Sequence, residues 1–268
     1  MSPAKALGLY TVVAMSLVSQ AQFGGPGEFP SFRNTSALPG SGFGVTPSGM
    51  AGFRGAMAYS TPVAYALAPW EVVAGMSIVS HDWRLAFQDT SSGDSKTGNG
   101  SVQLQFGLPV GKFGALSYGV LVKSSHGDNS GTVQWTPPGQ SGPVRFALGV
   151  QDWRGRGGSA GFGLPEDRDW ARSVYVVGTW QALDDTYVSV GYGDQHRYRG
   201  AFGNASHAIT PRLKAVGEYD TFNWNWILAY DLGKVAGPVL KDRRPVQVVA
   251  FVGQEAGKFG LWGFNVRF

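Results

Sequence analysis

The stretch from Leu261 to Phe268, LWGFNVRF, alternates large apolar residues with small or polar ones up to the last residue. Successive side chains of a β-strand point to opposite faces. Four apolar residues would therefore share one face of such a strand: Trp262, Phe264, Val266 and Phe268. The alternation predicts a strand whose apolar face is covered by a core or by lipid.

The same period of two recurs along the chain. It is clear in SVQLQFGL (101–108), VRFALGVQ (144–151) and NWNWILAYD (223–231). Turn residues separate such segments, and together they predict about twelve strands, with ten to fourteen as the range. The expected strands cover residues 71–80, 99–108, 113–124, 130–136, 144–153, 172–182, 186–193, 197–208, 212–220, 223–231, 245–253 and 258–268.

The composition favours a transmembrane antiparallel up-and-down β-barrel over a soluble β-sandwich. Charged residues make up 15% of the chain, aromatic residues make up 13%, and 40 residues are glycine. A soluble sandwich would carry more Lys and Glu on its solvent face. Here the polar face is mostly Gly, Gln, Ser and Asn, and several apolar strips end in rings that prefer the lipid headgroup zone: Trp135, Tyr192, Tyr219 and Tyr230.

The connections between the expected strands support the barrel. Bacterial barrels have long outer loops and short periplasmic turns. Residues 82–100 and 154–171 form long connections, whereas PVGK (109–112), ALDD (182–185) and TPR (210–212) are tight. The connection at 232–245 is longer than this rule predicts.

The chain divides into three parts by composition. Residues 1–21 resemble a secretory signal peptide, with one lysine, an apolar run from Ala6 to Val18 and a cleavage site near Ala21. Residues 22–70 are rich in Gly, Pro, Ser and Phe, which predicts a flexible periplasmic lead-in or an inward-folded plug. Residues 71–268 would form the barrel, located in the bacterial outer membrane of a Gram-negative envelope.

The terminal aromatic residue has a second implication. A strand that ends on Phe268 resembles the assembly signal of bacterial outer-membrane barrels. The resemblance implies that Trp262, Phe264, Val266 and Phe268 are recognised by the barrel-assembly machinery before they enter the closing strand. Outer-membrane lipid and that machinery are therefore the expected partners.

Several longer stretches resemble YjbH-like, exopolysaccharide-associated outer-membrane proteins. These are GFRGAMAYSTPVAYALAPWEVVAGMS (52–77), FALGVQDWRG (146–155), SVYVVGTW with YVSVGYG, and AFGNASHAITPRLKAVGEYD (201–220). The quoted motifs include Thr61-Pro62, Glu71 and Glu218-Tyr219-Asp220. The resemblance spans residues 52 to 231 and implies a barrel with a role in exopolysaccharide or capsule export, with polysaccharide and export components as further partners.

The sequence offers little for catalysis, cofactors or metals. His81, His126, His196 and His207 show no metal-binding spacing, and the chain has no cysteine. Ser80-His81 and Ser206-His207 are adjacent, which places the two side chains of each pair on opposite faces of a strand. We therefore expect no enzyme activity, no cofactor and no metal, and the scattered net charge of +4 gives no nucleic-acid site.

The best functional candidates are polar residues at inward positions of the expected strands. They are Gln103, Gln105, Lys123, Arg145, Gln151, Gln181, Arg199, Lys214, Glu218, Asp220, Asn225 and Arg267. They would either contact a sugar chain or small solutes in a water-filled lumen, or pair with one another and plug it.

Three functions follow from these alternatives. The first is exopolysaccharide or capsule export or assembly, as the family resemblance implies. The second is a general small-solute porin, and the third is a plugged structural or docking barrel.

Overall fold

The computed structural model describes residues 36–80, 99–122, 129–153, 172–194, 198, 200–221, 223–235, 246–255, 257 and 259–268. The predicted signal peptide, residues 1–21, lies outside these ranges, as do residues 22–35.

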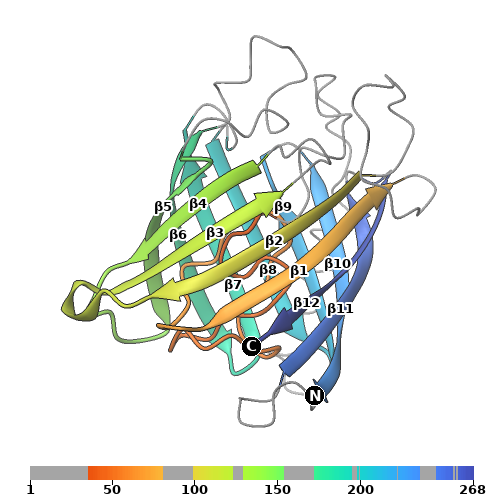
Figure 1. Cartoon of the computed structure of the whole chain (residues 1–268), viewed down its shortest axis with the longest axis horizontal. Coiled ribbons are helices and arrows are strands. Elements are labelled where there is room, and N and C mark those ends of the chain that lie inside the picture. The colour runs from red at the N-terminus through yellow and green to blue at the C-terminus, as the bar shows by residue number, and fades with distance from the viewer. Residues whose placement is uncertain are drawn as a thin grey trace.

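Twelve antiparallel strands form a closed barrel, which confirms the predicted fold (Figure 1). Each strand pairs with its neighbours in sequence, and the last strand returns to the first. The strands are β1 (Val72–Ser80), β2 (Asn99–Leu108), β3 (Ala115–Val122), β4 (Asn129–Thr136), β5 (Val144–Gln151), β6 (Ser173–Leu183), β7 (Thr186–Gly193), β8 (Gly200–Ala208), β9 (Leu213–Tyr219), β10 (Trp224–Val235), β11 (Val246–Glu255) and β12 (Phe259–Arg267).

The alternating segment at the end of the chain forms the closing strand, as predicted. In the β1–β12 pair, Met76 lies opposite Phe264 and Val73 lies opposite Arg267. The Phe268 N–H continues the ladder by donating to the Val72 carbonyl at 3.0 Å. Pairing of β12 with β1 removes the free edges that an open sheet would present.

The predicted strand faces are those observed. Gln103 points inward and is 1% exposed, whereas its neighbour Leu104 points outward and is 40% exposed. On β10, Ile227 and Ala229 are buried inside the barrel, whereas Trp226 and Leu228 are exposed outside. An apolar exterior around a closed barrel is the surface of a membrane-spanning barrel.

Some strand bounds differ from the predicted ones for local reasons. β3 begins at Ala115 rather than 113, because a short 3₁₀ helix, Gly111–Phe113, fills the turn before it. β10 continues to Val235, beyond the expected end at 231, through a bulge between Asp231 and Gly233. The first part of the long 232–245 connection is therefore strand.

Four described connections lie at one end of the barrel, which we call the turn end: residues 109–114, 137–143, 184–185 and 209–212. Glu71, before β1, and Phe268, after β12, lie at the same end, because Val72 and Phe268 are hydrogen-bonded there. Within the described part of the chain, no helix is long and apolar enough to cross a bilayer.

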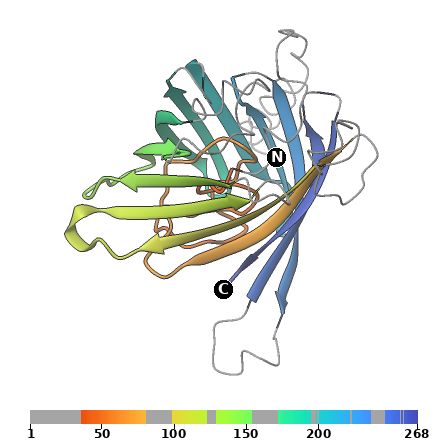
Figure 2. The same cartoon turned by 45° about the horizontal axis from the view of Figure 1, so that its top comes forward.

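Residues 36–70 fill the inside of the barrel, where they appear as an orange tube enclosed by the strands (Figures 1 and 2). We call this segment the plug. It folds back on itself through isolated bridges, in which Val45 pairs with both Ala51 and Ala56, and Ser41 pairs with Ala58. Its side chains pack with inward-facing apolar residues of the wall in one hydrophobic cluster, which includes Phe43, Tyr59, Ile227, Phe251 and Leu261.

Inward-facing glycines let the plug backbone lie directly against the wall. A Cβ atom on Gly119 would lie 1.9 Å from the Ala37 carbonyl oxygen, and one on Gly107 would lie 1.9 Å from the Ala68 carbonyl oxygen. No larger residue fits at either position without moving backbone. Part of the high glycine content is therefore explained by the volume that the plug occupies.

Candidate functional site

The contact between the plug and the barrel wall is the candidate functional site, because it decides whether the lumen is open. The strongest polar contact is the carboxylate of Glu218, on β9, which is 1% exposed. It accepts hydrogen bonds from the backbone N–H groups of Tyr59 at 3.0 Å, Ser60 at 2.9 Å and Thr61 at 3.2 Å. The hydroxyls of Ser60 and Thr61 donate to the same carboxylate at 2.6 Å and 2.9 Å.

The wall next to Glu218 extends this cradle. Asn225, on β10, donates through Nδ2 to Glu218 Oε1 and to Asp220 Oδ2, both at 3.2 Å. On β8, Asn204 Nδ2 donates to Thr61 Oγ1 at 2.9 Å and to the Pro62 carbonyl at 3.1 Å. The hydrogen bonds to the Glu218 and Asp220 carboxylates are charge-assisted, and such bonds are roughly twice as strong as neutral ones. Glu218 and its neighbours therefore fix residues 59–62 of the plug.

Lys214 lies nearer the turn end on the same strand and is fully buried. Its Nζ donates to the Gly55 carbonyl at 2.5 Å and lies 5.6 Å from the ring centre of Phe53 and 5.7 Å from that of Tyr187. A carbonyl and two ring faces partly compensate an ammonium group that has left water. The plug thus covers a cation that would otherwise face an aqueous lumen.

Among the described residues, two ion pairs hold the plug at the turn end. Arg54 binds Asp185, in the β6–β7 turn, through two of its nitrogens, and the Arg54 side chain is mostly exposed. Glu71, at the end of the plug, binds Arg267 of β12 at 2.8 Å and 3.0 Å, and also accepts from the Ala51 N–H at 3.2 Å. The Glu71–Arg267 pair joins the plug to both edges of the barrel seam.

Neutral side chains fix the plug on the opposite wall. Gln103 accepts from the Ala37 N–H at 3.1 Å and donates to the Ser41 carbonyl at 3.0 Å. Further along, Thr179 accepts from the Ala64 N–H at 2.7 Å, and Gln134 donates to the Val63 carbonyl at 2.8 Å. Three more hydroxyl groups contact plug backbone in the same way: Ser117, Thr132 and Thr136.

The structure places most of the predicted lumen-lining residues inside the barrel. Seven are buried inside the barrel: Gln103, Gln105, Gln151, Lys214, Glu218, Asp220 and Asn225. Arg145, Gln181 and Arg267 are half-buried at the turn end. Lys123 and Arg199 lie outside the described residues.

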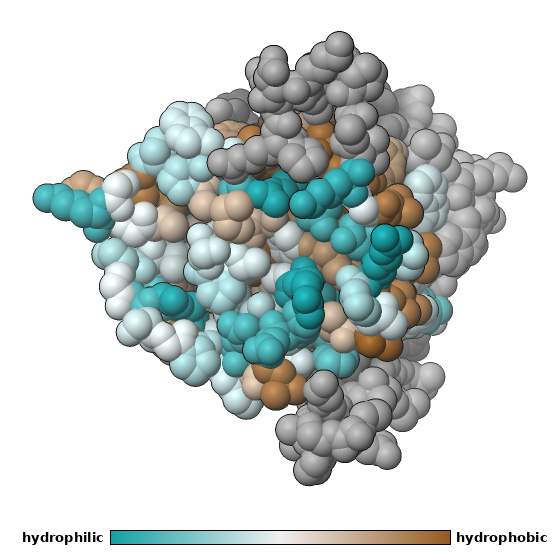
Figure 3. Space-filling view, turned by 90° about the horizontal axis from the view of Figure 1, so that it is seen from below, coloured by the Kyte–Doolittle hydropathy of each residue, from teal (hydrophilic) through white to brown (hydrophobic). Residues whose placement is uncertain are grey.

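The mouth at the turn end is covered with atoms rather than hollow (Figure 3). Hydrophilic residues gather over its centre, and hydrophobic residues are more frequent toward its edges. This view agrees with the contacts of the plug.

Ser206 and His207 lie on opposite faces of β8, as their adjacency predicted. The Ser206 hydroxyl accepts from the Met57 N–H inside the barrel at 3.2 Å, whereas His207 Nδ1 is hydrogen-bonded to Thr186 Oγ1 at 2.8 Å. His81, His126 and His196 lie outside the described residues. In the described part of the chain, no three His, Cys, Asp or Glu residues are grouped to hold a metal.

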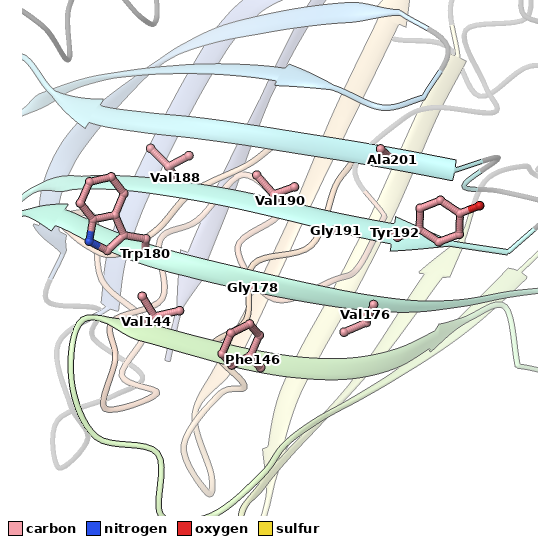
Figure 4. Close-up of a pocket in the computed structure, with 10 residues that line it drawn as sticks. All are labelled: Val144, Phe146, Val176, Gly178, Trp180, Val188, Val190, Gly191, Tyr192 and Ala201. Carbon is pink, nitrogen blue, oxygen red and sulfur yellow. The ribbon is translucent and has the colours of Figure 1, made fainter.

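The outer wall carries one apolar groove of about 580 Å³ across β5 to β8 (Figure 4). Gly178, which faces outward, leaves a hollow between Phe146, Val176 and Val190. Trp180 and Tyr192 lie toward opposite ends of the groove. The groove belongs to the lipid-facing surface and not to the lumen.

The residues of the plug that contact the wall carry no recognisable sequence pattern. Arg54, Ser60 and Tyr65 were part of a segment with no regular period. A usable signal was present in the strands, where apolar residues such as Ile227 and Phe251 occupy inward positions that a water-filled lumen does not favour. Such residues indicate that something apolar fills the barrel.

No family model and no curated protein matches the chain. Among solved structures it is similar to a KdgM porin, with 12% identity and a TM-score of 0.43 over 74% of this chain and 98% of that one. It is also similar to outer membrane phospholipase A from Escherichia coli, with 10% identity and a TM-score of 0.39 over 76% of this chain and 93% of that one. A mutant porin of Rh. blastica gives 11% identity and a TM-score of 0.35 over 63% and 55%.

Proposed function

We propose that this chain is a bacterial outer-membrane barrel whose resting state is closed by its own plug. The observation that carries the proposal is the Glu218 carboxylate, which binds three consecutive backbone N–H groups and two hydroxyls of the plug. A constitutively open small-solute porin needs a continuous aqueous lumen. A plug fixed by ion pairs and hydrogen bonds to both sides of the wall supports a closed lumen instead.

The exterior supports the membrane placement. Outward residues such as Val102, Leu104 and Val252 are apolar and exposed. Aromatic residues occur near both ends of the strands, with Trp180 toward the turn end and Tyr192 toward the other. Aromatic girdles at both interfaces are typical of outer-membrane barrels. The turn end would face the periplasm, because short turns lie on that side.

The finer proposal is a role in exopolysaccharide export or assembly. It is supported by the resemblance to YjbH-like proteins, whose quoted motifs contain both Thr61 and Glu218. These two residues are hydrogen-bonded to each other between plug and wall. If a glycan passes through this barrel, the plug has to move; if the barrel only docks export components, the plug stays.

Conductance in planar bilayers tests the closed state. The wild-type barrel is expected to show no steady conductance. Glu218→Gln, which removes the charge that the plug donors bind, is expected to produce open events, and deletion of residues 36–67 is expected to give a large steady conductance. Asp184→Asn is the matched control, because Asp184 is an exposed carboxylate of a turn. Steady wild-type conductance equal to that of the deletion variant would overturn the proposal in favour of a general porin.

The glycan role needs a cellular measurement. Deletion of the gene is expected to lower the amount of secreted polysaccharide, and the wild-type gene is expected to restore it. Unchanged polysaccharide would refute the glycan role but leave the plugged barrel intact.

A further inference from the structure

Among the described residues, no carboxylate forms an ion pair with the guanidinium of Arg145. Arg145 is the first inward side chain of β5 at the turn end, where it lies opposite Thr179 of β6. Within the described ranges, no hydrogen bond or ion pair reaches it, and its Nε is buried. The residue is half-buried, and its two terminal nitrogens are not among the buried polar atoms that lack a partner. They are therefore accessible from the lumen.

The hydroxyl of Tyr65, in the plug, is a second polar group without a hydrogen-bond partner among the described residues. This hydroxyl is buried. The Ala64 N–H donates to Thr179, the register partner of Arg145, so that Tyr65 follows directly after a residue fixed next to Arg145. Its ring packs edge-on against Tyr187 with ring centres 6.0 Å apart.

The Tyr65 hydroxyl is protonated and can donate a hydrogen bond. Burial raises the pKa of Tyr65 well above its ordinary value, and Tyr187 acts in the same direction, whereas the positive charge of Arg145 lowers it. The phenol therefore stays protonated at neutral pH and keeps an O–H to donate.

Neither carboxylate of the β6–β7 turn forms an ion pair with Arg145. Asp185 is bound by Arg54. Asp184 is exposed in the turn, where its carbonyl oxygen accepts from Gln181 Nε2 at 3.2 Å. In the part of the chain that the structure describes, the inward cation Arg145 therefore has no carboxylate partner, and the Tyr65 hydroxyl has no hydrogen-bond partner.

We propose that Arg145 and Tyr65 form an anion-binding site at the turn end of the lumen, which takes a carboxylate or phosphate group arriving from the periplasmic side. The planar guanidinium offers paired N–H donors that match the spacing of carboxylate and phosphate oxygens. The Tyr65 hydroxyl supplies a third donor, which recovers a hydrogen bond that the empty site lacks. The site does not depend on the proposed glycan role.

Isothermal titration calorimetry of the full-length protein in a neutral detergent at low ionic strength tests the site. The probes are glucuronate, inorganic phosphate and, as the neutral match of glucuronate, glucose. Wild-type protein is expected to bind at least one of the two anions and not glucose, with an affinity that falls as salt is added. Stronger binding of glucuronate would identify acidic sugars as the source of the anion, and stronger binding of phosphate would identify free phosphate.

Variants assign the binding to the two residues. Arg145→Gln is expected to weaken binding at least tenfold, Tyr65→Phe severalfold, and Arg145→Lys less than Arg145→Gln because the charge is kept. Arg212→Gln, an exposed arginine in the β8–β9 turn, is the control and should bind as the wild type does. The proposal is overturned if the wild type binds neither anion, or if both Arg145→Gln and Tyr65→Phe bind as the wild type does. None of these results depends on the conductance measurement above.

Discussion

Arg267, the last residue of β12, binds Glu71, the residue before β1, through Nε to Oε2 at 2.8 Å and Nη2 to Oε1 at 3.0 Å. Glu71 is 1% exposed, and the Arg267 side chain is 19% exposed. The pair therefore joins the two ends of the sheet and the end of the plug in one partly buried contact. It fastens the place where the barrel closes.

Breaking this pair should destabilise the barrel. Arg267→Gln removes the guanidinium from the buried Glu71 carboxylate, and we expect a loss of roughly 3 kcal/mol in the free energy of unfolding. Denaturant titration in detergent, followed by tryptophan fluorescence, measures it. Arg212→Gln, which removes an exposed turn arginine, should change the midpoint little. Equal midpoints for the two variants would contradict the role of the seam pair.

Two glycines of the plug, Gly55 and Gly52, provide a test variant and its control for how tightly the plug is packed. A Cβ atom on Gly55 would lie 2.3 to 2.6 Å from backbone atoms of Val45, whereas one on Gly52 has nothing within 4 Å. Gly55→Ala should therefore loosen the plug by about 1–3 kcal/mol, and Gly52→Ala should not.

The chain has no cysteine, so a single introduced cysteine can be labelled specifically to measure this loosening of the plug. Met57 is fully buried, so a cysteine introduced there by Met57→Cys reports exposure of the plug through its maleimide labelling rate. Adding Gly55→Ala should raise that rate roughly ten- to hundredfold, following the loss of plug stability. A rate that rises as much with Gly52→Ala would mean that the Gly55 contact is not what holds this part of the plug.

The outward face of the strands predicts that a charged residue costs more stability in the middle of a strand than at the rim of the barrel. Leu104→Arg places a charge on the outward face of β2 and should cost roughly 2–4 kcal/mol. Phe113→Arg, at the exposed turn after the same strand, should cost about 0–1 kcal/mol, because the charge stays near the headgroups. Unfolding in lipid vesicles compares the two variants, and similar losses would place the bilayer elsewhere on the barrel.

Gln103→Arg distinguishes a filled lumen from a wet one. In a water-filled barrel an inward arginine would be tolerated, whereas here Gln103 bonds to Ala37, Ser41 and Asn265. We expect the longer cation to displace the start of the plug and to raise labelling of Met57→Cys. Unchanged labelling would show that residues 36–41 contribute little to keeping the plug in place.

The wall of the barrel was predictable because its signal is local. The alternation around Leu104 or Phe264 needs only a few neighbouring residues to be recognised, and the twelve strands follow from such segments with small errors at their ends. The same rule placed Lys214 and Glu218 on one inward face. Bulges and turns, such as the 3₁₀ helix at Gly111–Phe113, accounted for the errors.

The partners of those inward residues could not be predicted. Glu218 binds Ser60, which is 158 positions earlier in the chain, and no periodic pattern marks residues 36–70. Irregular backbone is held by individual contacts, which have no sequence period. The Arg145 and Tyr65 pair was hidden for the same reason, because only the folded plug brings Tyr65 to the wall.

The position of the plug in the chain constrains how the molecule is made. Residues 36–70 run into β1 through Glu71, and the strand that seals the wall is the last one, β12. During synthesis the plug is therefore made before the strands of the wall that surround it. If β12 joins β1 while residues 36–70 are in place, the wall closes around them. The machinery that inserts this protein would then have to accommodate the plug together with the strands.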